Sequence, residues 1–172
     1  MAQEAISSII QYLPIAIETV SDINARDYMA WADMLAGLCI ANAGKILPHA
    51  IAMSVGGYFP QVMHGETLAI VYPEFIKCTY EASIKKFAYL GRILNPELVN
   101  ESDENAALKS CELMNLFLKK IGMWLSFEGF GISRESIQSI LDYGLKFGAC
   151  LDGPGDVTSE TVYEILVNSY SR

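Results

Sequence analysis

Apolar residues recur at helical spacing along almost the whole chain. A stripe near its start repeats about every 3.6 residues, the period of an α-helix, and consists of Ala5, Ile6, Ile9, Ile10, Leu13 and Ile17. Pro14 interrupts the stripe and is expected to kink this helix or to end its first part, because proline lacks a backbone N–H. No alternating strand pattern persists, so the chain is predicted to be all-α.

A second helix is predicted from about Asn24 to Gly44, with Ser21 and Asp22 as polar residues that cap its start. Its faces are small and apolar, with the residues Ala30, Ala32, Ala36, Gly37, Ala41, Ala43 and Gly44. Small side chains let neighbouring helices approach closely. We therefore expect this helix to be central and buried.

Further helices are predicted at about residues 48–56, 66–72, 76–94 and 104–122, from Ser133 onwards, and from Thr158 to about Tyr170. Pro48 should lie in the first turn of its helix, and Gly56-Gly57 should end that helix. His64 or Gly65 is expected to open the next helix, which Pro73 kinks or restarts. The pattern predicts an all-α bundle of about seven helices.

Length and composition agree with a single helical domain over residues 1–172. Apolar residues make up 52% of the chain and charged residues 19%, which allows a core and argues against disorder. The net charge of −8 argues against a nucleic-acid partner and against docking on an acidic membrane surface, since both need clustered Lys and Arg. No secretory signal is recognisable at the start, and the apolar stretches are too short to span a bilayer, so we expect a cytoplasmic protein.

The four cysteines, Cys39, Cys78, Cys111 and Cys150, lie far apart in the sequence. No Cys-x-x-Cys pair exists, so the sequence does not indicate a sulfur-based zinc site or a dense disulfide framework. Buried free thiols are the simplest prediction for all four.

The two histidines, His49 and His64, lie on either side of Gly56-Gly57. Imidazole is the commonest metal ligand in proteins and the usual proton carrier near neutral pH. A helix, a turn and a second helix of this size can return the chain so that both imidazoles face one cavity. On spacing alone, a structural interpretation is favoured, with His49 as a hydrogen-bonded core residue and His64 as a helix cap.

The residues around the histidines favour a metal site. Small residues follow His49, and His64-Gly65 begins a His-Gly-x-x-x-Ala-x-x-x-Pro pattern that ends at Pro73. This segment resembles the iron-dependent (group III) alcohol dehydrogenase family. The resemblance extends to further segments and so covers nearly the whole chain: Ala5–Pro14, Asn24–Met29, Ala36–Gly44 and Asp156–Tyr170.

The resemblance implies that His49 and His64 bind a catalytic divalent metal, iron or zinc. The family's metal takes one Asp and three His ligands, and the Asp and the first His lie on a helix that precedes the matching segment. That helix and the family's N-terminal nucleotide-binding domain, which binds NAD(P), are expected to be absent from this chain. The substrate of the complete enzyme would be a small alcohol or aldehyde, and the chain alone is expected to be inactive.

Two departures from the family pattern concern the site itself. The spacing from His49 to His64 is one residue longer than the resemblance implies, so the loop between them is expected to be rearranged. Many members carry a second histidine four residues after the first ligand, where this chain has Met53. Met53 cannot handle a proton and is expected to line an apolar pocket instead.

Three carboxylates could support the two imidazoles by hydrogen bonding. Asp27, Asp33 and Glu66 are candidates for hydrogen bonding to a metal-bound imidazole. Asp33, inside an apolar helix, is expected to make a buried hydrogen bond. Glu66, in the first turn of a helix, is more simply explained as a partner of the helix dipole.

Two other functions stay open at this point. One is a non-catalytic helical module that acts through a partner chain, with an exposed apolar face that favours self-association. The other is a helical metal sensor that takes further ligands from Asp33, Glu66 or Cys39.

Overall fold

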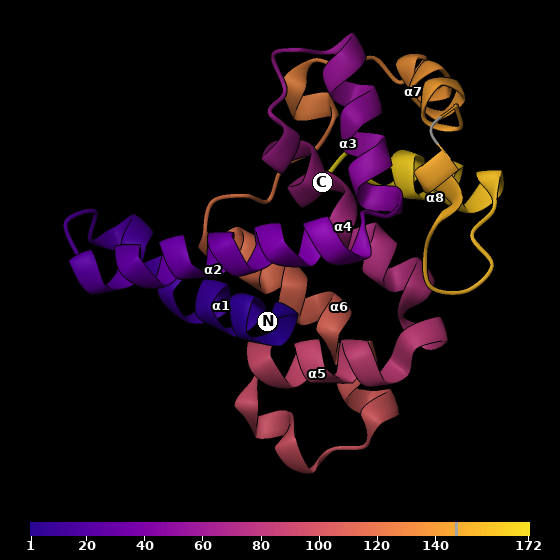
Figure 1. Ribbon diagram of the computed structural model, residues 1–172. Coiled ribbons are helices and arrows are strands. Elements are labelled where there is room, and N and C mark those ends of the chain that lie inside the picture. Colours follow the sequence, from indigo (N-terminus) through magenta and orange to yellow (C-terminus); the bar gives the residue numbers. More distant parts are fainter. Residues whose placement is uncertain (147) are drawn as a thin grey trace. The chain divides into compact units, whose positions relative to one another are not determined.

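The structure is a computed structural model that describes residues 1–146 and 148–172 (Figure 1). The described residues contain α-helices and short 3-10 helices and no β-strand. The all-α prediction is thereby confirmed. The α-helices are α1 (Ala2–Glu18), α2 (Ile23–Ala43), α3 (Leu47–Tyr58), α4 (His64–Thr79), α5 (Ile84–Leu94), α6 (Asp103–Lys120), α7 (Ser136–Gly144) and α8 (Ser159–Asn168). The 3-10 helices are η1 (Tyr80–Ser83), η2 (Pro96–Asn100), η3 (Glu128–Phe130) and η4 (Gly148–Leu151).

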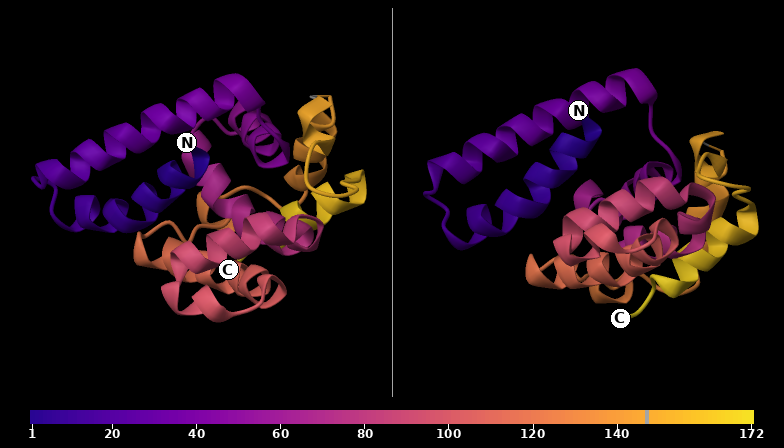
Figure 2. Two further views of the ribbon diagram at one scale, coloured as in Figure 1. Left: turned by 60° about the horizontal axis from the view of Figure 1, so that its bottom comes forward. Right: turned by 90° about the horizontal axis from the view of Figure 1, so that it is seen from below.

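The helices form two compact units, Met1–Lys45 and Ile46–Arg172. The single domain over residues 1–172 stays a prediction. The first unit is a hairpin of α1 and α2, seen from two sides in Figure 2. Its small core consists of Ala5, Ala32 and Leu35, with Ile9 and Met29 packed against them.

Two side-chain contacts hold the hairpin together outside this core. The rings of Tyr12 and Tyr28 stack with centroids 3.9 Å apart and an interplanar angle of 3°. The indole N–H of Trp31 donates a hydrogen bond to Glu4 Oε1 at 2.9 Å. Because α1 runs from Ala2 to Glu18 without a break, Pro14 does not end it.

The prediction that α2 is central and buried is wrong. The Asp22 carboxylate caps the helix by accepting the Ala25 N–H at 2.9 Å, as its sequence predicts. However, only Ala25, Ala32 and Leu35 of its 21 residues are buried. These three share the face that packs on α1, and the opposite face, which carries Asp27 between Ile23 and Met34, is exposed. Apolar composition alone therefore did not identify which face is covered.

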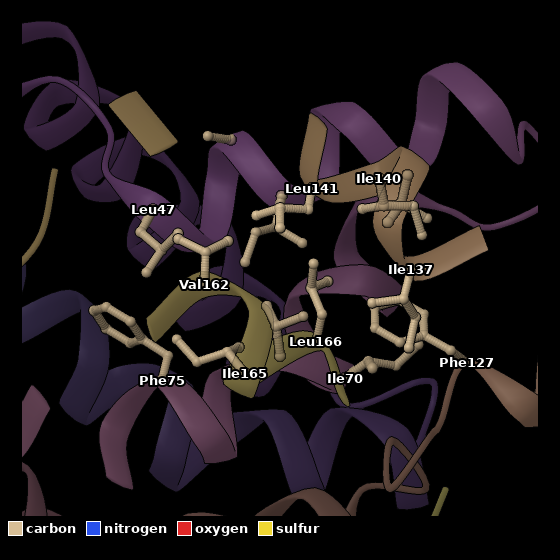
Figure 3. Packing of buried hydrophobic residues seen from close by; sticks show 14 of the residues in the cluster. Leu47, Ile70, Phe75, Phe127, Ile137, Ile140, Leu141, Val162, Ile165 and Leu166 are labelled. Atoms are coloured by element: carbon tan, nitrogen blue, oxygen red, sulfur yellow. The ribbon is translucent and has the colours of Figure 1, made fainter. Parts of the chain in front are cut away.

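The main core lies in the second unit, between α3, α4, α7 and α8 (Figure 3). Its fully buried side chains include Leu47, Ile70, Phe127, Ile137, Ile140, Ile165 and Leu166. Burying each such side chain contributes about 1.5–3 kcal/mol to folding. This core fixes α3 and α4, the two helices that carry the histidines.

The end of α3 differs from the prediction. Gly56-Gly57 does not end the helix, which continues to Tyr58. Phe59 leaves the helical conformation (φ −130°, ψ 71°) because it precedes Pro60, and proline disfavours the α conformation of the residue before it. A Cβ built on Gly57 would lie 3.5 Å from the Tyr143 ring, which is an ordinary van der Waals contact.

Two other boundaries differ from the predicted ones. The helix through Pro73 is not restarted there but continues to Thr79, where the backbone leaves the helix and the hydroxyl donates to Phe75 O at 2.7 Å. The next helix, α5, follows only after η1. The helix predicted from Ser133 begins at Ser136.

The C-terminal residue of the chain anchors α4. The Arg172 guanidinium donates hydrogen bonds to Leu125 O, at 3.1 Å, and to Ile70 O. It also lies over the Trp124 ring, 4.4 Å from its centroid. Burial lowers the pKa of Arg172 from its ordinary value, but the group stays charged near neutral pH.

All four cysteines are free thiols. The prediction of buried thiols is correct for Cys150 and wrong for Cys78, which is exposed; Cys39 and Cys111 are half-buried. Burial raises the pKa of the Cys150 thiol to about 11.

No single helix in the described part of the chain is both long and apolar enough to cross a membrane. α2 and α3 reach the required length and composition only when they are taken together across the break between them.

The crossing of α5 and α6 gives a first prediction. A Cβ on Gly91 would lie 2.2 Å from Ala106 O, a backbone atom that cannot move by itself. Gly91→Ala should therefore lower the free energy of unfolding by about 1–3 kcal/mol, as overpacking does. Gly37→Ala is the matched control, since a Cβ on Gly37 meets nothing within 4 Å. The control should raise stability by up to about 1 kcal/mol, as measured by urea unfolding; equal effects of the two changes would contradict this packing.

Thiol labelling gives a second prediction. At pH 8 the raised pKa of Cys150 leaves only about one thiol in a thousand ionised. Iodoacetamide should therefore modify Cys78 first and Cys150 only after unfolding in urea, as followed by peptide mass spectrometry. Equally rapid labelling of both thiols in the folded protein would show that Cys150 is not buried.

Candidate metal site

His49 is the third residue of α3 and is half-buried. The start of this helix is held by the Leu47 N–H, which donates to Asp152 O at 2.9 Å. Pro48 follows in the first turn, where its missing N–H costs nothing because that turn has no acceptor for it. His49 therefore projects from a backbone that is fixed by the main core.

His64 is the first residue of α4 and is exposed. Glu66 fixes this end of the helix, because its Oε2 accepts the Met63 N–H at 2.8 Å. The Thr67 N–H donates to Met63 O at 3.1 Å and closes the first turn. Glu66 thus caps the start of α4, and its place in the first turn agrees with its predicted role as a partner of the helix dipole.

The connection between the two helices is short and anchored. The Phe59 N–H donates to Val55 O at 2.7 Å, and the Val62 N–H donates to Phe59 O at 2.9 Å. Val62 is buried in the main core. These contacts return the chain so that the start of α4 lies beside the start of α3.

The two imidazoles meet as the sequence predicts. His49 Nδ1 and His64 Nε2 lie 2.9 Å apart, and the ring centroids are 4.4 Å apart at an interplanar angle of 64°. Without a metal, one ring donates its N–H and the other accepts it, and the choice depends on the tautomers. The contact draws on two residues that are fifteen positions apart.

The distance between these nitrogens fits a shared metal. Two imidazole nitrogens that each bind one ion at about 2.0–2.1 Å lie roughly 2.9–3.4 Å apart, for coordination angles between about 90° and 109°. The observed 2.9 Å lies at the lower end of that range. The separation of the two nitrogens therefore fits a shared cation, although each ring would have to turn so that its lone pair points off the line between the nitrogens.

The other candidate ligands do not complete this pair. In residues 1–146 and 148–172, no group of three or more His, Cys, Asp or Glu side chains is arranged to hold a metal. Asp27 and Asp33 lie on α2 and are exposed, so the predicted buried hydrogen bond of Asp33 is wrong. A metal sensor that takes its third ligand from Asp33, Glu66 or Cys39 therefore has no support in the described residues.

Met53 follows His49 by one helical turn, so both side chains lie on the same side of α3. Its side chain is 45% exposed. A thioether neither donates nor accepts a proton near neutral pH. Met53 therefore gives this side of α3 an apolar and polarisable surface next to the imidazole pair.

An aromatic pair at the end of α3 was not predicted. Tyr58 and Tyr143 pack edge to face, with ring centroids 5.4 Å apart at 80°.

Comparison with known proteins identifies relatives over nearly the whole chain. Residues 1–170 match the C-terminal part of the Fe-containing alcohol dehydrogenase family. The NAD-dependent methanol dehydrogenase of Bacillus methanolicus is 26% identical over 168 residues, which are 98% of this chain and 44% of the relative. The 1,3-propanediol dehydrogenase of Klebsiella pneumoniae is 27% identical, over 98% of this chain and 43% of its own length.

Solved structures agree with the sequence relatives. A crystal structure of 1,3-propanediol oxidoreductase matches with a TM-score of 0.90 and 25% identity, over 98% of this chain and 44% of that protein. An alcohol dehydrogenase from Oenococcus oeni matches with a TM-score of 0.89 and 28% identity, over the same shares of the two chains. The chain thus spans less than half the length of the proteins that it resembles, and it corresponds to their C-terminal part.

Proposed function

The chain belongs to the Fe-containing alcohol dehydrogenase family, and we propose that its His49 and His64 are two ligands of the catalytic metal of an NAD(P)-dependent alcohol dehydrogenase. The observation that carries this proposal is the 2.9 Å contact between His49 Nδ1 and His64 Nε2. The contact joins two helices at their first turns, where the core and the Glu66 cap hold each backbone in place.

Each part of the site has a distinct task. The imidazoles hold a divalent cation, iron or zinc, since nitrogen ligands suit both. When bound, the metal polarises the alcohol oxygen and lowers its pKa, so that hydride can pass to the nicotinamide. Met53 cannot accept the alcohol proton, so the proton must leave by another route, and the thioether offers an apolar contact for the carbon chain of the substrate.

The activity requires more than these 172 residues supply. Catalytic zinc sites usually take three protein ligands, and the described residues bring two imidazoles together. The relatives are more than twice as long. We therefore propose that the remaining ligands and the nucleotide-binding surface come from the part of the family's fold to which this chain does not correspond. The substrate class would be small primary alcohols or their aldehydes, in line with the names of the relatives.

Metal titration tests the role of the two histidines. The chain should bind Zn²⁺ weakly, and His49→Ala or His64→Ala should each weaken binding by more than about tenfold, because a single remaining imidazole is a poor site. Met53→Ala is the matched control on the same side of α3 and should leave the affinity unchanged. Competition with a chromophoric chelator measures all four proteins. Unchanged affinity in both histidine variants would show that the contact is only structural.

Turnover is the second test. The purified chain, loaded with Zn²⁺ or Fe²⁺ and mixed with NAD⁺ or NADP⁺ and ethanol or 1,3-propanediol, should form no reduced nicotinamide above the rate without protein. The reason is that the ligand set and the cofactor surface are incomplete. Reduction that follows the protein concentration and disappears in His64→Ala would contradict this expectation.

A non-catalytic module that acts by association is the second candidate function. The observation that favours it lies outside the metal site: α2 exposes large apolar side chains, among them Ile23, Trp31, Met34 and Leu38.

A further inference from the structure

The start of α3, the helix that carries His49, has no side chain to cap it. The residue before the helix is Ile46, whose side chain accepts no hydrogen bond, and Pro48 has no N–H. The Leu47 N–H, a donor without an intrahelical partner, donates instead to Asp152 O at 2.9 Å. The first turn of α3 is thus closed by a carbonyl from a loop far away in the sequence, whereas α2, α6 and α8 begin with capping side chains.

That loop, residues 152–157, is anchored at both ends within the second unit, and we call it the strap. It begins directly after η4, and its first residue supplies the carbonyl that holds α3. Its last residue, Val157, packs against the main core. Thr158 follows and caps α8 by accepting the Thr161 N–H at 3.3 Å. The two ends of the strap are therefore fixed by the same core that holds α3 and α4.

The middle of the strap lies close against α4 and η1, and glycines permit this approach. Gly155 has a φ of +79°, and a Cβ built on it would lie 2.9 Å from Ala82 Cβ, in η1. A Cβ on Gly153 would lie 2.7 Å from Val157 Cγ2 and 3.9 Å from the Phe75 ring, in α4. A side chain at either position would therefore push the strap out of its place.

We propose that the strap positions His49 for metal binding, by holding the first turn of α3 in the orientation that brings His49 Nδ1 to 2.9 Å from His64 Nε2. His49 comes two residues after Leu47, so a change in the direction of this turn moves the imidazole. Because the strap bonds to α3 and lies against α4 and η1, it fixes one ligand-bearing helix relative to the other. The role in metal binding rests on the proposed function, whereas the position of the two rings depends on no metal.

Three variants separate positioning from stability. Gly155→Ala loosens the strap, because it adds a Cβ against Ala82 at positive φ. Gly122→Ala is the matched control: Gly122 has a φ of +74° and lies outside the strap, and a Cβ there meets nothing within 4 Å. Both changes should lower the midpoint of urea unfolding through backbone strain. Gly155→Ala combined with Ala82→Gly is the rescue variant, since it removes the atom with which the new Cβ collides.

Nuclear Overhauser measurements on the metal-free chains test the position of the rings. The chain holds two histidines, so their ring signals stand apart. The natural chain, Gly122→Ala and the rescue variant should show a strong effect between the two rings, and Gly155→Ala should lose most of it. If Gly155→Ala lacks the helical circular-dichroism spectrum, Ala82→Val replaces it, because it presses on Gly155 without backbone strain. An undiminished effect in the folded variant would overturn the proposal.

Competition for Zn²⁺ with a chromophoric chelator tests the metal. Gly155→Ala should weaken binding by about tenfold, as the loss of a contact that orients a metal ligand does. Gly122→Ala should bind as the natural chain does, and the rescue variant should regain most of the affinity. If His49→Ala weakens binding but Gly155→Ala does not, the strap proposal is overturned and the proposed function stands. If His49→Ala has no effect, the proposed function fails, and the strap is decided by the Overhauser effect between the rings.

Discussion

The contact between the His49 and His64 imidazoles is the constraint on which this account of the site depends. It exists because α3 and α4 are both fixed near their first turns, one by the Leu47 hydrogen bond to Asp152 O and the other by the Glu66 cap. Val62 anchors the connection between them in the core. The second unit can thus be understood as a scaffold that holds two nitrogens 2.9 Å apart. Two neutral imidazoles can share a proton at that distance, and a divalent cation can take its place.

Membership of the family and the geometry of the His49–His64 contact support each other. The C-terminal part of the Fe-containing alcohol dehydrogenase family matches nearly the whole chain, and the chain spans less than half of its relatives. In the described residues, no group of three or more His, Cys, Asp or Glu side chains is arranged to hold a metal.

The sequence predicted most helices from their amphipathic stripes. The pairing of His49 with His64 followed from the resemblance to the dehydrogenase family, because their spacing alone favoured a structural role. The sequence-based predictions were wrong where more than one residue could determine the same structural feature. The end of α3 was assigned to Gly56-Gly57, although the steric effect of Pro60 on Phe59 sets it. The prediction that α2 is buried rests on its small apolar residues. Such residues occur on covered and on exposed faces of this helix, so they do not identify the face that is buried. Asp33 was expected to be buried for the same reason.

The most direct test of the central claim is X-ray absorption at the zinc edge of the chain loaded with one equivalent of Zn²⁺. The account predicts the scattering pattern of two imidazole rings, with oxygen from water completing the coordination. In the His49→Ala variant one of the two rings should be lost. A spectrum with sulfur ligands from the free thiols, or with no imidazole scattering, would contradict the assignment of His49 and His64 as metal ligands.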